Sequence, residues 1–215
     1  MKRLFSLSAP LLLAAAAQAQ LGPIANVDMK FTGLKLGGAG KVTIDGRELN
    51  VGVGKLGFDV TAQGTTTPAI TVCADLINTL DDKSHPYAVH LTPDDFSPAG
   101  RAGKIVATHF AAADTKEKAQ GLQIAVWEAL SDNGSSFDNG GRFRVDLSFG
   151  STTQQGSALY YANEYYSATT GRAVWAKTGA NGGQSQMTPV PEPASLAALA
   201  VGGFALLRRR RAARG

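Results

Sequence analysis

The sequence predicts a mainly β domain of antiparallel strands with at least one packed helix, an α+β arrangement that takes a sandwich or barrel-like form. Apolar and polar residues alternate with a period near two over several short segments, and glycines separate these segments. One longer stretch instead carries apolar residues at helical spacing. In the first half of the chain, the segments expected to be strands are 27–32, 41–45, 49–53, 55–60 and 69–74.

The helix is expected after residue 113. Asp114 followed by Glu117 has the form of a capping box, and Asn133-Gly134 supplies a stop. The apolar stripe between these signals consists of Ala119, Leu122, Val126, Ala129 and Leu130. Gln123 and Trp127 lie along the edge of this stripe, so the Gln123 amide points toward the core and needs a hydrogen-bond partner there.

Strand patterns return after the helix. Residues 143–149 alternate, and residues 158–161 and 173–176 form aromatic and β-branched segments. Residues 86–98 are rich in Pro, Asp and Ser, which predicts irregular structure. Residues 179–189 consist largely of Gly, Asn, Gln and Ser and predict a flexible linker, so the globular domain is expected to cover residues 20–178.

The N-terminus has the form of a signal peptide. Lys2 and Arg3 precede an apolar run that is too short to span a bilayer, and Ala17-Gln18-Ala19 forms a small-x-small cleavage site. We therefore expect export machinery to translocate the chain and to remove residues 1–19.

The C-terminus combines a Pro-Glu-Pro motif, a short apolar run over residues 194–207 and a cluster of arginines. The motif is Pro191, Glu192 and Pro193, and the arginines are Arg208, Arg209, Arg210 and Arg211. Residues 190–215 resemble the PEP-CTERM sorting tail of Gram-negative bacteria that make exopolysaccharide. The resemblance implies transient anchoring in the inner membrane with the arginines as a stop-transfer signal, cutting by an exosortase-type enzyme, and delivery to the cell surface or extracellular matrix. The alternative is a simple tail anchor.

The net charge of the chain does not indicate a nucleic-acid partner. The whole sequence has a formal net charge of +4, but seven of its cations and one of its carboxylates lie in the two terminal segments. Removing them leaves 14 cations and 16 carboxylates in the central domain. That domain contains a single cysteine, Cys73, so a disulfide within the chain is impossible.

Two short segments carry the candidate chemistry. Val72-Cys73-Ala74-Asp75 and Leu122-Gln123-Ile124-Ala125-Val126-Trp127 resemble the cysteine motif and the Gln-x-Ala-aliphatic-Trp motif of the thioester (TQXA) domains in Gram-positive surface adhesins. Leu122 stands where that family commonly has Thr. The resemblance implies that the Cys73 thiol attacks the Gln123 amide, expels ammonia and leaves a thioester that can acylate an amine. Asp75, Ala125 and Trp127 would support the bond.

The elements expected to carry these two residues suit such a reaction. A side-chain amide is a poor electrophile, so the thiol and the amide must be held together by rigid elements, here a strand end and a helix. Burial would protect the product from water. We therefore expect adhesion or extracellular-matrix attachment, with an amine-bearing surface or exopolysaccharide as the target, and neither turnover catalysis nor a cofactor.

Two other functions remain open. One is a non-covalent structural or glycan-binding matrix protein, in which Cys73 and Gln123 are ordinary core residues and the aromatic residues Tyr160, Tyr161, Tyr165 and Tyr166 stack on sugars. The other is a secreted cysteine hydrolase that pairs Cys73 with His85, His90 or His109. The histidine spacing does not favour a metal site, and the oxygen-rich residues 132–138 are expected to form a solvated turn.

Overall fold

The computed structural model describes residues 24–190 except 133, 135 and 179–182. The elements are β1 (Ala25–Ile44), β2 (Arg47–Ala62), β3 (Thr65–Cys73), β4 (Ser84–Leu91), α1 (Pro98–His109), α2 (Lys116–Ser131), β5 (Phe143–Val145), a 3-10 helix (Leu147–Phe149), α3 (Ala158–Tyr165), β6 (Ala173–Thr178) and β7 (Gln186–Pro189). The expected signal peptide, Pro-Glu-Pro motif, apolar run and terminal arginines lie outside the described residues. Within those residues, no helix is long and apolar enough to cross a membrane.

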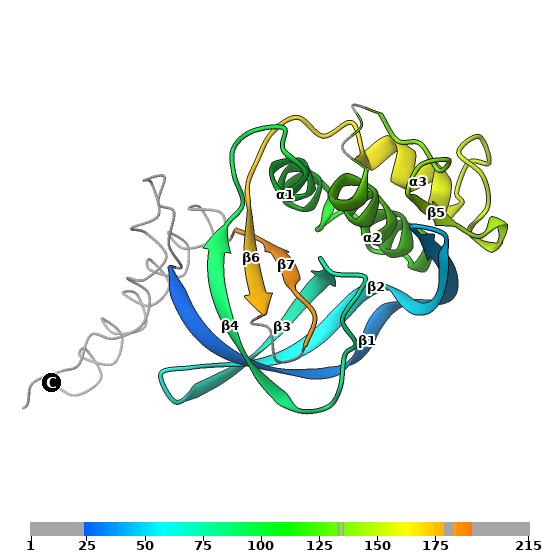
Figure 1. The fold of residues 1–215 in the computed structure, drawn as a ribbon. Helices are drawn as coiled ribbons and strands as arrows, with labels where there is room; N and C mark the ends of the chain where they lie inside the picture. Colours follow the sequence, from blue (N-terminus) through cyan, green and yellow to red (C-terminus); the bar gives the residue numbers. More distant parts are fainter. Residues whose placement is uncertain (1–23, 133, 135, 179–182, 191–215) are drawn as a thin grey trace, which may run out of the picture. The chain divides into compact units, whose positions relative to one another are not determined.

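Six strands form a closed antiparallel barrel (Figure 1). The strand order is β1, β2, β3, β7, β6 and β4, and β4 pairs with β1 to close the circle. The 20-residue strand β1 can join two parts of the fold because its first residues pair with β4 and its last three residues pair with β5. The mainly β, antiparallel prediction is confirmed, and the form is the barrel.

A tight turn sets the register of the long β1–β2 hairpin. Asp45 and Gly46 have φ angles of +49° and +79°, the left-handed values that a two-residue type I′ turn requires at both positions. An Asp-Gly pair tolerates these values, and the turn brings Ile44 directly opposite Arg47.

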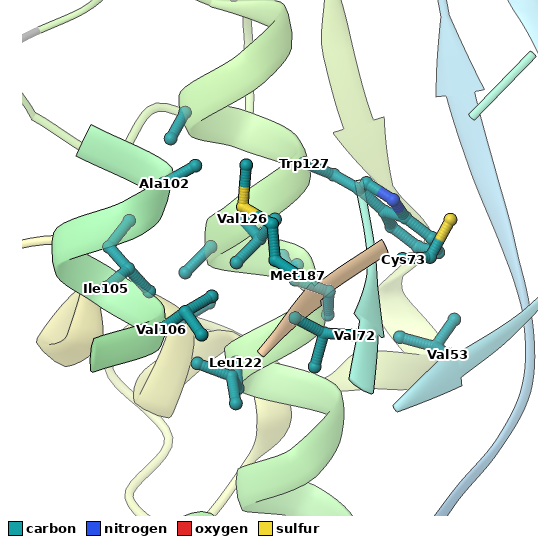
Figure 2. Packing of buried hydrophobic residues seen from close by; sticks show 14 of the residues in the cluster. Val53, Val72, Cys73, Ala102, Ile105, Val106, Leu122, Val126, Trp127 and Met187 are labelled. Carbon is teal, nitrogen blue, oxygen red and sulfur yellow. The ribbon is translucent and has the colours of Figure 1, made fainter. Parts of the chain in front are cut away.

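The helices pack against the barrel and against one another. α2 contacts both α1 and α3, and it also contacts β1, β2 and β3. In Figure 1 the three helices gather on one side of the barrel, with α2 beside the end of β3. Strand and helix side chains therefore share one core, in which Val53, Val72 and Met187 from the barrel meet Leu122 and Val126 of α2 (Figure 2). Burying one such side chain stabilises the fold by roughly 1.5–3 kcal/mol.

Several boundaries differ from the sequence prediction. Residues 84–91 form β4 although they overlap the segment expected to be irregular, and α1 was not predicted. Residues 158–161 begin a helix, α3, where a strand was expected. In the segment 143–149, only the first three residues are strand and the last three form a 3-10 helix.

The expected linker is also shorter than predicted. Residues 186–189 form β7, which pairs with β3 on one side and with β6 on the other. Gln186 and Met187 are buried in this position. The folded part therefore extends through Pro189 and does not end at residue 178.

The start of α2 is one residue later than predicted. Thr115 is the N-cap, and its hydroxyl accepts a hydrogen bond from the Lys118 N–H (3.3 Å). Asp114, the predicted cap, instead forms an exposed ion pair with the Lys118 ammonium (2.8 Å).

This correction gives a direct test. Thr115→Ala should lower the free energy of unfolding by about 1 kcal/mol because it removes the capping acceptor. Asp114→Ala should have a much smaller effect, because an exposed ion pair contributes little. Urea denaturation of both variants measures the two values. The reverse order would show that Asp114 caps the helix.

Candidate functional site

Cys73 is the last residue of β3, at a position where the strand has a neighbour on only one side. Pairing with β2 ends at Val72, which lies opposite Lys55, while Cys73 still lies opposite Gln186 of β7. In an antiparallel ladder, successive residues direct their N–H and C=O groups to alternate sides. The backbone of Cys73 therefore needs partners on the side that β2 no longer covers.

Gln123 of α2 supplies these partners. The Cys73 N–H donates to Gln123 Oε1 (2.7 Å), and Gln123 Nε2 donates to the Cys73 carbonyl oxygen (2.6 Å). The Gln123 side chain is fully buried, and its amide acts as a one-residue substitute for the missing strand. The partner that the helical pattern required for Gln123 is thus the backbone of Cys73.

The Cys73 thiol is enclosed by polar groups of two other segments. Its Sγ donates to the backbone oxygen of Asp75 (2.7 Å) and lies 3.2 Å from Gln184 Oε1. Burial, only partly offset by the hydrogen bond to Asp75, raises the pKa of the Cys73 thiol to about 12. The sulfur is therefore a protonated thiol at neutral pH.

Trp127 lies one helical turn beyond Gln123 and covers the sulfur. Figure 2 shows the nitrogen of its indole ring directed toward Cys73, and this N–H lowers the pKa of the thiol slightly. Among the described residues, Trp127 Nε1 has no partner that meets full hydrogen-bond geometry. The indole packs in an edge-to-face arrangement against Phe143, with the ring centroids 6.1 Å apart.

Asp75 shapes the segment that follows Cys73. Its carboxylate accepts hydrogen bonds from the N–H groups of Ile77 (2.8 Å) and Asn78 (3.2 Å). The fold thus gathers Cys73, Asp75, Gln123 and Trp127 in one place. Ala125 of α2 is fully buried in the hydrophobic core.

Gln184 belongs to the same site and was not predicted. Its Oε1 faces the thiol, and its Nε2 donates to the backbone oxygen of Asn78. The surrounding Gly, Asn, Gln and Ser residues have the composition of a linker, so no local signal in the sequence distinguishes Gln184 from its neighbours.

The histidines have other contacts. His85 Nε2 lies 2.6 Å from Asp81 Oδ1, and His109 stacks on Tyr165 with ring centroids 4.4 Å apart. Burial lowers the pKa of His109. Among residues 24–190 as described, no group of three or more His, Cys, Asp or Glu could hold a metal ion.

The carboxylates of the oxygen-rich segment 132–138 bind backbone N–H groups. Asp132 accepts hydrogen bonds from Arg142 (3.0 Å) and Phe143 (3.1 Å), and Asp138 accepts one from Gly140 (2.9 Å). These bonds hold a turn together.

Tyr165 is the last residue of α3 and Tyr166 follows it. Both side chains are buried.

Comparison with known proteins identifies the C-terminal segment. The family model of the PEP-CTERM protein-sorting motif matches residues 189–211. No curated protein and no solved structure matches the chain. The matched motif agrees with the predicted sorting tail, and it implies export, processing by an exosortase-type sorting enzyme and sorting to the cell surface.

Proposed function

We propose that this surface-sorted protein attaches covalently to an amine-bearing target through a thioester between Cys73 and Gln123. The contact between the Gln123 amide and the backbone of Cys73 carries the proposal. Both residues are buried on rigid elements, so the fold holds the Gln123 amide against residue 73. Such preorganisation is what an unreactive amide requires.

The reaction would proceed in two steps. Cys73 Sγ forms a bond to Gln123 Cδ, the Cδ–Nε2 bond breaks, and the thiol proton leaves with Nε2 as ammonia. A target amine then attacks the same carbon, the S–C bond breaks, and a proton returns to the sulfur. The products are an amide on Gln123 and the original Cys73 thiol, so each molecule reacts once.

The neighbouring groups have roles that suit these steps. The Cys73 N–H, 2.7 Å from Oε1, would stabilise the negative charge that develops on this oxygen during attack. The Asp75 carbonyl orients the S–H proton. Trp127 directs its indole N–H toward the sulfur and excludes water from it.

Intact mass spectrometry of the secreted, signal-cleaved protein tests the proposal. We expect a mass lower than the calculated value by one ammonia, and addition of one full methylamine on treatment with that amine. Cys73→Ser and Gln123→Ala should abolish both effects. Gln120→Ala is the matched control, because it replaces the buried glutamine one turn earlier on α2 and should leave both effects intact.

A mass equal to the calculated value, unchanged by methylamine, would overturn the thioester proposal. The protein would then be a non-covalent structural or glycan-binding matrix component, and one observation favours that alternative. The Gln123 amide already has two satisfied hydrogen bonds, as a purely structural residue would. The geometry fits a secreted cysteine hydrolase less well, because the Cys73 thiol donates to the backbone oxygen of Asp75, while His85 lies beside Asp81 and His109 stacks on Tyr165.

A further inference from the structure

A groove of about 650 Å³ lies beside the candidate thioester site. Its walls come from the β1–β2 hairpin and from residues 76–80, the segment that follows the Cys73 site. Most of the lining side chains are apolar, among them Leu34, Leu49, Val51, Leu76 and Ile77. Leu34 and Ile77 are also exposed, by 39% and 80% of their surface, which is unusual for large apolar side chains in one groove.

The groove reaches the thiol through two residues. Trp127 and Gln184 both line it; Gln184 Oε1 lies 3.2 Å from Cys73 Sγ, and the indole nitrogen of Trp127 is directed toward Cys73 (Figure 2). Gln184 bridges the two segments, since its Oε1 faces Sγ and its Nε2 binds the backbone oxygen of Asn78. Gln184 therefore belongs both to the lining of the groove and to the surroundings of the thiol.

The charges along the groove favour an uncharged occupant. Asp45 and Arg47 are the ionisable residues in the lining, and the Asp45 carboxylate is bound by both Arg142 Nε (2.7 Å) and Nη2 (2.8 Å). No unpaired carboxylate in this lining could stabilise an ammonium group. Apolar surroundings lower the pKa of an amine, and the uncharged amine is the form that attacks a thioester.

We propose that this groove admits the target amine, and that it selects a primary amine on an unbranched alkyl chain, as in a lysyl side chain. The proposal rests on the covalent function proposed above. Leu34 and Ile77 contact the alkyl chain, and the Gln184 side chain swings aside to let the nitrogen reach the Gln123 carbonyl carbon. The amine forms the new amide bond, and its proton passes to Cys73 Sγ as the S–C bond breaks.

Amine reactivity measured by mass spectrometry tests the selectivity. At equal concentrations of free base, n-pentylamine should react at least tenfold faster than methylamine, since each methylene buried in the groove gives about a threefold to fourfold gain. Leu34→Ser and Ile77→Ser should reduce this ratio severalfold. Ile70→Ser is the matched control, because Ile70 is 47% exposed on β3 and does not line the groove. Equal rates for the two amines, or an equal effect of Ile70→Ser, would overturn the proposal.

A second measurement separates the groove from the covalent bond. In a Cys73→Ser, Trp175→Phe protein, which cannot form a thioester, Trp127 is the remaining tryptophan and reports on the groove by fluorescence. 1-Hexanol, an uncharged chain of similar shape, should give a saturable change that Leu34→Ser and Ile77→Ser weaken several-fold and Ile70→Ser does not. If 1-hexanol gives no saturable change but the native protein has lost ammonia, the groove proposal is wrong and the thioester proposal stands. If 1-hexanol gives a saturable change but the native protein has not lost ammonia, the proposed covalent function is wrong, and so is the proposed role of the amine.

Discussion

Replacing Gln123 with methionine should lower the free energy of unfolding by about 2–4 kcal/mol, the largest effect expected of any single substitution at the site. Methionine has nearly the same length but can neither accept from the Cys73 N–H nor donate to the Cys73 C=O. Cys73 is only 2% exposed, so water cannot replace these partners. Each buried group left without a partner costs about 1–3 kcal/mol, and the gain from burying an apolar side chain offsets part of this.

The measurement requires a background in which the proposed thioester cannot form. In Cys73→Ala protein the backbone of residue 73 is retained and no thioester can form, so urea denaturation reports the hydrogen bonds alone. Gln120→Met on the same helix should cost less than about 1 kcal/mol, because it leaves both bonds to residue 73 in place. Equal losses for Gln123→Met and Gln120→Met would show that the Cys73 backbone does not depend on Gln123.

The proximity of Cys73 and Gln123 shows what the sequence can reveal about this fold. A helical stripe with a glutamine at its edge predicts a buried amide that needs a partner, and the amide does have one. The period of two near Cys73 predicts a strand, which is confirmed, although periodicity cannot identify the neighbouring strands. The barrel closure and the end of β2 pairing at Val72 depend on contacts between distant segments.

The errors in the prediction have local causes. Pro86 suggested a break in regular structure, but it lies on β4 before pairing with β6 begins at Tyr87, where a missing N–H is tolerated. The aromatic residues after Ala158 favour a strand, but Ser157 caps a helix by accepting from the Tyr160 N–H (3.2 Å). Tertiary packing against α2 then determines the outcome.

Gln184 marks the limit of local inference most clearly. Its segment has a linker composition, yet β7 follows immediately because two barrel strands, β3 and β6, leave a gap that one strand can fill. Both the groove and the environment of the thiol depend on this long-range placement. The proximity of Cys73 and Gln123 could therefore be predicted from two motifs, whereas the placement of Gln184 and of the groove could not.

The stability of the protein should decrease as pH rises through neutrality, and Glu128 is the cause. Glu128 follows Trp127 on α2 and is 1% exposed. Its Oε1 accepts from the Asp138 N–H (3.0 Å), while its Oε2 has no hydrogen-bond partner among the described residues. Burial, reinforced by the nearby carboxylates of Asp132 and Asp138, raises the pKa of Glu128 from 4.5 to about 7.

The direction of the effect follows from the raised pKa. Between pH 4.5 and pH 7 the folded protein holds a proton on Glu128 that the unfolded chain has released. This contribution to stability is complete below the unfolded pKa and disappears as pH rises through the folded pKa. The full loss between pH 4.5 and pH 8 amounts to about 3 kcal/mol. Partial burial lowers the pKa of His109, which acts in the opposite direction below pH 6.5, so the wild-type curve alone does not isolate Glu128.

Comparison with Glu128→Gln isolates the effect, because every other titrating group is common to the two proteins. Glutamine keeps the acceptor for the Asp138 N–H and cannot ionise. The two proteins should have similar unfolding free energies at pH 5, and the variant should be the more stable by about 3 kcal/mol at pH 8, still below the range in which Cys73 titrates. Urea denaturation at intervals between these values measures the difference. Parallel curves over this range would mean that Glu128 ionises normally and that its buried Oε2 is solvated in the folded protein.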